Sequence, residues 1–135
     1  MENPSAFPMG DPNDGFAQYF VGQSYLAPVL ETPEISIHNV TFEPGCRNNW
    51  HIHHGAAQVL IAVGGRGYYQ IEGGEPKELK AGQAVRIPAD TKHWHGAAPG
   101  ESFSHLAFMV PTGDPKAISN EWLEPVGAEA YNALS

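Results

Sequence analysis

Glycine and proline interrupt this chain at short intervals, and this spacing constrains its fold more than any other feature. The 135 residues include 15 Gly and 12 Pro, scattered without a fixed period. Proline breaks a helix interior and glycine weakens it, so the sequence disfavours long helices. We therefore expect one domain built from many short strands joined by turns.

Between these interruptions lie short apolar and β-branched runs of the kind that form half-buried strands. The first run, 34–42, stops at Pro44 and Gly45. Further runs are 58–63, 67–71, 77–79, 83–87 and 103–110. The Gly-rich segment 72–76 has the turn residues of a tight hairpin. Short strands at this spacing predict an all-β sandwich or barrel.

Three parts of the chain differ in composition. Residues 1–33 are rich in Pro, Gly and Asn, and we expect an arm packed on the barrel, with a helical turn near 15–20. Residues 34–111 form the expected barrel. Residues 112–135 form a C-terminal extension that ends in a short helix near 127–134.

Charge and composition exclude several classes of partner. The net charge of −8 argues against nucleic acid, whose binding depends on Lys and Arg. No segment approaches the roughly 20 apolar residues of a membrane span, and the N-terminus lacks a basic cluster followed by an apolar run. We expect a cytoplasmic protein without membrane contact.

The single Cys46 excludes an intramolecular disulfide and is expected to be a small buried side chain.

Five of the seven histidines fall in two clusters, 51–54 and 93–95. Alternate side chains of an extended strand share one face, so His51 and His53 point the same way and can hold one ion together. By the same alternation, His54 points away from them.

Gln58 and His93 complete a candidate metal site with His51 and His53. Gln58 begins the next apolar run, and His93 comes from a distant strand that would close the site across the barrel. Neutral imidazole binds Zn, Cu, Fe and Ni, and a carbonyl oxygen suits harder ions such as Mn. Because all four ligands are neutral, the ion would keep its full charge and polarise a substrate oxygen strongly.

These residues resemble the two motifs of the cupin family. The matching positions are Gly45, His51, His53, Gln58 and Gly65 in the first motif, and Gly82, Pro88 and His93 in the second. The chain departs from the usual pattern at Gln58, where Glu is common, and at Asp90, where Gly is usual; the final Asn of the second motif is absent. The resemblance implies a double-stranded β-helix, or jelly-roll, barrel.

A narrower resemblance rests on the segments 48–53, 92–98 and 104–106. They look like a bacterial group of short cupins named alongside carboxymuconolactone decarboxylase. The group is similar to the manganese-dependent cupin hydroxynitrile lyases, which use three His and one Gln as ligands. The resemblance implies one divalent transition metal ion per chain, with Mn favoured and Fe, Ni or Zn as alternatives. Two further histidines lie near the metal in that group, and here they correspond to His95 and His105.

The remaining histidines and the tryptophans differ in their expected roles. His95 shares a face with His93, and His105 shares one with the inward residues of 103–107, so acid-base and supporting roles stay open for both. We expect structural roles for His38 and His54. Trp50 and Trp94 point to the opposite side of their strands from the ligands, and we expect them to pack outside the inner shell of the site, in the core or at a dimer interface. Exposed tryptophans and the N-terminal arm favour a homodimer.

The leading functional hypothesis is a metal-dependent lyase acting on a small oxygenated molecule. The ion would hold a hydroxyl or carbonyl oxygen while His95 or His105 moves its proton and a carbon–carbon bond breaks or forms. Cyanohydrin cleavage is the example from the family. Isomerisation and decarboxylation use the same groups. A metal-dependent dioxygenase and a non-catalytic sugar- or small-molecule-binding protein also remain open.

Overall fold

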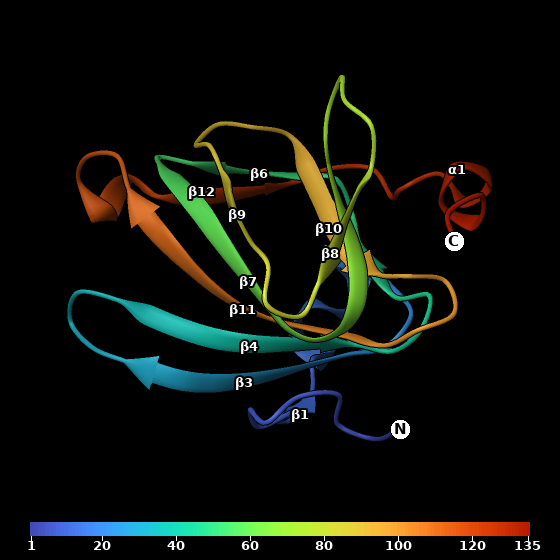
Figure 1. Cartoon of the computed structure of the whole chain (residues 1–135). Helices are drawn as coiled ribbons and strands as arrows, with labels where there is room; N and C mark the ends of the chain where they lie inside the picture. Colours follow the sequence, from blue (N-terminus) through green and yellow to red (C-terminus); the bar gives the residue numbers. More distant parts are fainter.

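The structure is a computed structural model that describes all residues, 1–135. One curled sheet of twelve strands forms a half-barrel, and the helices are short (Figure 1). This arrangement confirms the predicted all-β class. The strands are β1 (Asp11–Pro12), β2 (Phe20–Val21), β3 (Ser24–Glu31), β4 (Ser36–Phe42), β5 (Arg47–Asn48), β6 (His51–His54), β7 (Ala56–Ile71), β8 (Lys77–Lys80), β9 (Ala84–Ile87), β10 (His93–Ala97), β11 (Phe103–Pro111) and β12 (Ser119–Trp122). The helices are the 3-10 turns η1 (Asp14–Tyr19) and η2 (Pro115–Ala117) and the α-helix α1 (Ala128–Asn132). None of them is long and apolar enough to cross a membrane.

Strand β7 connects the two halves of the curled sheet. Its first part pairs with β11 and β9, and its second part pairs with β10 and β8. The sequence predicted two separate strands at 58–63 and 67–71, whereas one strand runs through both. Gly65, between the two runs, has a φ of 66°, and an added Cβ would lie 1.9 Å from the carbonyl oxygen of Ser102. Only glycine fits this close approach.

The N-terminal segment contributes strands to the sheet. The predicted helical turn is η1, but residues 24–31 of the expected arm form β3, which pairs with β4 along most of its length. Pro28 argues against a strand, because it lacks a backbone donor. A register shift between Pro28 and Leu30 accommodates the proline.

The C-terminal segment covers the outer face of β10. Trp94 is 1% exposed and packs edge-on against Tyr131 of α1 at 5.9 Å between ring centroids. Of the two roles expected for Trp94, the structure shows the core role, so Trp94 is not one of the exposed tryptophans and offers no surface to a second copy. The homodimer stays a prediction.

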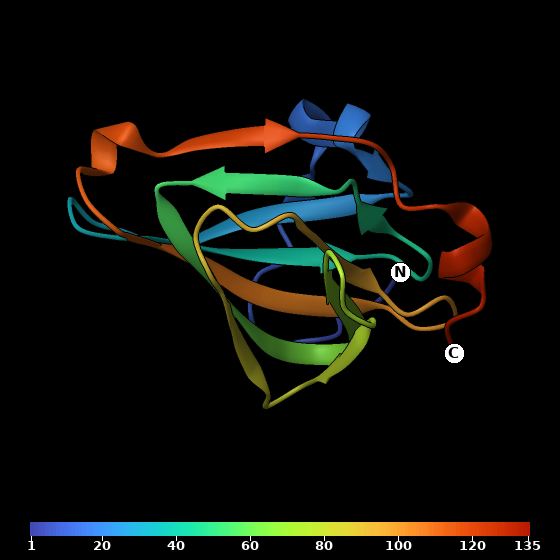
Figure 2. The ribbon, with the colours of Figure 1, turned by 90° about the horizontal axis from the view of Figure 1, so that it is seen from above.

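Strand β12 pairs with β6 and lies beside it near η1, as Figure 2 shows.

The larger of the two buried hydrophobic clusters contains side chains from β4, β7, β8, β10 and β11. It is a cluster of six buried residues: Phe42, Cys46, Ala62, Leu79, Ala97 and Phe103. Cys46 is fully buried, as expected, and burial raises the pKa of its thiol to about 12. This thiol is unreactive, because the thiolate is the nucleophilic form. His95 and His105 lie against this cluster, with ring centroids 6.0 Å and 5.4 Å from that of Phe42.

Candidate metal centre

Three strands bring the predicted ligands together. Strand β6 carries His51 and His53, β10 carries His93, and β7 carries Gln58. His93 is paired directly with His51 across the two strands. The ligating nitrogens of the three histidines lie within 4.8 Å of one another, close enough to share one ion.

The Nδ1 atom of each histidine forms a hydrogen bond with an oxygen atom. The Nδ1 atoms of His51 and His93 lie 2.8 Å and 2.9 Å from the carbonyl oxygens of Asn49 and Thr91. A carbonyl oxygen only accepts, so each Nδ1 carries the proton and each Nε2 keeps its lone pair. His53 follows the same pattern, with Nδ1 2.7 Å from Oδ1 of Asn120. These contacts fix the tautomer that binds metal through Nε2.

Gln58 adds a fourth acceptor to the cluster. Its Oε1 atom lies 3.1 Å from Nε2 of His53 and 3.2 Å from Nε2 of His93. If each Nδ1 holds the proton, neither nitrogen can donate to this oxygen, so acceptors face one another. A bound cation relieves that arrangement. The donor set therefore fits a divalent metal ion, and the identity of the metal stays a prediction.

Burial keeps the three histidines in their neutral form. Desolvation lowers the pKa of His51 well below 6.5, and the neighbouring His93 and His53 lower it further. Desolvation also lowers the pKa of His93 to about 4 and that of His53. Neutral imidazole is the form that a metal binds, so the protein prepares these ligands before any ion arrives.

A second buried group lies next to the metal cluster. Nε2 of His105 lies 3.1 Å from Nδ1 of His95, and Nδ1 of His105 lies 3.2 Å from the carbonyl oxygen of Leu106. Since Nδ1 of His105 donates to that carbonyl, its Nε2 accepts a hydrogen bond from Nδ1–H of His95. Asn48 fixes His95, because its Oδ1 accepts the backbone N–H of His95 at 2.9 Å. The sequence did not indicate Asn48.

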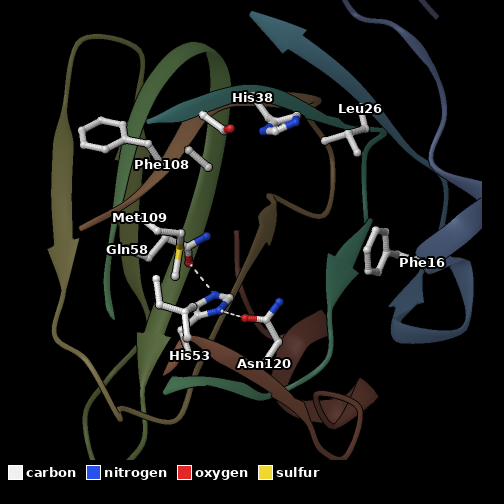
Figure 3. A pocket seen from close by; sticks show the side chains of 11 residues that line it. Phe16, Leu26, His38, His53, Gln58, Phe108, Met109 and Asn120 are labelled. Carbon is white, nitrogen blue, oxygen red and sulfur yellow. Dashed lines mark hydrogen bonds between the residues drawn. The ribbon is translucent and has the colours of Figure 1, made fainter. Parts of the chain in front are cut away.

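Two adjoining cavities give access to these groups. The inner one, of about 190 Å³, is bordered by His51, His95 and His105. The outer one, of about 450 Å³, is bordered by His53 and mostly apolar side chains (Figure 3). Six residues border both cavities: Phe16, Leu26, His53, Gln58, Ala107 and Asn120.

Strand β12 supplies two site residues that the sequence did not indicate. Trp122 lies 4.8 Å from His51 between ring centroids, and Tyr19 of η1 stacks on its other side at 4.5 Å. Oδ1 of Asn120 accepts a hydrogen bond from Nδ1–H of His53. The stretch 119–122 is too short and polar to stand out as a strand. Only its pairing with β6 brings it to the site.

His38 and His54, for which we expect structural roles, lie in different surroundings. His54 lies outside both cavities, where its ring contacts Glu121 at 2.7 Å and Asp90 at 3.3 Å. His38 borders the outer cavity, and its structural role stays a prediction. Asp90 has a φ of 60°, the left-handed conformation for which glycine is favoured. This conformation explains why most cupin motifs have Gly at that position.

We predict that His105 makes the metal-free protein less stable in acid. Full burial lowers the pKa of His105 to about 4, against an ordinary value of 6.5. Between these values the unfolded chain binds the additional proton, so the free energy of unfolding falls by about 3 kcal/mol as the pH drops through this range. Urea unfolding at several pH values should show a shallower dependence for His105→Gln. Equal dependence in both proteins contradicts the prediction.

Comparison with known proteins identifies the fold family. The model of the Cupin domain matches residues 38–110, more than half of the chain. The chain belongs to the cupin family. The three-histidine cluster lies within the matched residues, whereas Trp122 lies outside them.

Individual cupins resemble the chain over most of its length. It is 39% identical over 120 residues to an (R)-mandelonitrile lyase from Granulicella tundricola, covering 87% of this chain and 88% of that one. A cupin-like protein from Thermotoga maritima superposes with a TM-score of 0.83 and 31% identity, covering 97% of both chains. The DMSP lyase DddQ from Ruegeria pomeroyi shares the fold alone, with a TM-score of 0.63, 19% identity, and coverage of 91% of this chain and 58% of that one.

Proposed function

We propose that this cupin is a manganese-dependent lyase that cleaves and forms the carbon–carbon bond of a small cyanohydrin. The observation that carries the proposal is the 39% identity to a mandelonitrile lyase, combined with a cluster of three histidines that suits a metal ion. Iron, nickel and zinc suit the same ligands, so the choice of manganese rests on the resemblance to the hydroxynitrile lyases.

The metal would be held by His51, His53 and His93 through Nε2 and by Gln58 through Oε1. When bound, it would supply Lewis-acid polarisation of a substrate hydroxyl or carbonyl oxygen. Hydrogen bonds to two backbone carbonyls and to Asn120 hold the three imidazole rings in place. The rings therefore need little reorganisation when the metal binds. Trp122 packs against the ring of His51 and restricts the movement of that ring.

The pair of His95 and His105 would handle the proton. Cyanohydrin cleavage transfers the hydroxyl proton to a base, and the electron pair of the carbon–carbon bond leaves with cyanide. The same proton then returns to cyanide, giving an aldehyde and hydrogen cyanide. Both rings are buried, and desolvation lowers their pKa values, so both are neutral. Nε2 of His95 keeps a lone pair that can take the proton, while His105 accepts the hydrogen bond from Nδ1 of His95 and orients that ring. They border the inner cavity with His51.

The outer cavity would hold the organic part of the substrate. Apolar side chains of η1, β3 and β11 form its walls, including Phe16, Leu26 and Met109 (Figure 3). Such walls exclude water from the reacting end and bind an aromatic or aliphatic group through burial of apolar surface.

Cleavage of mandelonitrile tests the proposal. Protein loaded with Mn²⁺ should convert racemic mandelonitrile to benzaldehyde, measured by ultraviolet absorbance, and should consume one enantiomer first, measured by chiral chromatography. His54→Gln is the matched control, since His54 lies outside both cavities, and it should retain full activity. Full metal occupancy without cleavage above the rate in free Mn²⁺ solution contradicts the proposed function.

A further inference from the structure

The outer cavity has polar groups at two opposite ends. His53, Gln58 and Asn120 form the end next to the metal cluster, and Figure 3 shows His38 at the opposite end. Ser36, on the same strand as His38 and two residues away, also borders the cavity. Between the two ends the walls are mainly apolar. A ligand spanning the cavity therefore meets polar groups at both of its ends.

Strand pairing fixes the separation between the two ends. His38 of β4 pairs with Ala107 of β11, and Met109 of β11 pairs with Gln58 of β7. His38 and Gln58 thus lie two strands apart, at positions offset by two residues. Neighbouring strands are about 4.8 Å apart and two residues span about 6.8 Å along a strand, so the two backbones are about 12 Å apart. This span leaves room for a compact apolar spacer, such as one aromatic ring, between the two side chains.

The ring of His38 is available to a ligand. Its Nε2 atom lies 3.7 Å from Oε1 of Glu31, which is longer than a hydrogen bond. The two side chains are 35% and 61% exposed, so water screens the pair and it contributes little to stability. Both the donor and the acceptor of the imidazole can therefore bind a group that enters the cavity.

We propose that His38 recognises a hydroxyl group at the far end of the substrate. This inference rests on the proposed function and names the substrate class as hydroxylated aryl cyanohydrins and the matching aldehydes. A hydroxyl group donates and accepts, which suits both the imidazole and the Ser36 hydroxyl. An anionic substituent is disfavoured, because Glu31 lies beside His38 and the whole chain carries a net charge of −8.

Two probes of nearly equal shape test this subsite. Para-hydroxybenzyl alcohol and para-methylbenzyl alcohol share the reacting-end hydroxyl and differ only at the far end. Titration calorimetry on the Mn²⁺-loaded protein should give about threefold to tenfold tighter binding of the hydroxyl probe, the value of one hydrogen bond. His38→Leu should remove this preference while leaving the affinity for the methyl probe within twofold. His38→Gln, which keeps a donor and an acceptor, should restore part of it.

The controls separate this inference from the proposed function. His54→Leu, a substitution outside the cavities, should keep the preference, and thermal unfolding should confirm that each variant is folded. An equal preference in the wild type and in His38→Leu overturns the inference, as does failure of either probe to bind. Mandelonitrile cleavage is measured independently, so a lyase without this preference keeps the proposed function and loses the hydroxyl subsite.

Discussion

His51→Ala and His93→Ala should each purify without bound metal, whereas the wild type should contain about one divalent ion per chain. Each substitution removes one of three nitrogens that lie within 4.8 Å of one another. The remaining imidazole pair and the amide of Gln58 form an incomplete site. Elemental analysis of protein purified without added metal measures the loss and identifies the metal. Activity should fall by about three orders of magnitude, because metal polarisation contributes several kcal/mol to the barrier.

The control for this experiment is His54→Ala. His54 is the neighbour of His53 on β6, but its ring contacts Asp90 and Glu121 instead of the cluster. It should bind as much metal as the wild type. Chelation should abolish wild-type activity, and added Mn²⁺ should restore it. Metal-free wild type that stays empty after reconstitution contradicts the catalytic site and leaves a binding barrel.

His95→Gln and His105→Gln should each lower kcat by about 10² to 10⁴ while the metal content stays at the wild-type level. Neither ring belongs to the metal cluster, and the two are joined by a 3.1 Å contact. Glutamine keeps hydrogen-bonding groups in the buried site, but it cannot take up a proton at neutral pH. Steady-state kinetics with mandelonitrile and elemental analysis of the same samples provide both measurements.

The double variant shows whether the two histidines act together. If one proton position is shared between them, His95→Gln combined with His105→Gln should be no slower than the worse single variant by more than about tenfold. If the loss of kcat in the double variant equals the product of the losses in the two single variants, the two histidines act independently, and this result contradicts a shared proton. A loss of metal in either single variant shows that the ring supports the ligands, and the kcat of that variant then no longer reports on proton transfer.

Much of the fold and the metal cluster could be predicted, because both depend on local patterns. Alternation along a strand places His51 and His53 on one face, and the hairpin at 72–76 joins β7 to β8 as the glycines indicate. The long β7 and the strand β3 were missed, because Gly65 and Pro28 resemble interruptions. A close backbone approach at Gly65 and a register shift after Pro28 let each strand continue.

The sequence by itself determined the all-β class, the histidine pair of one strand and the distant histidine that completes the cluster. Only the tertiary structure decided which other residues join them. Asn120 contacts His53 although the two residues are 67 positions apart in the chain. The pairing of β4 with β11 brings His38 to the outer cavity. Trp94 is covered by α1 for the same reason. Local periodicity shows which face a side chain occupies, whereas its neighbours depend on strand pairing between segments far apart in the chain.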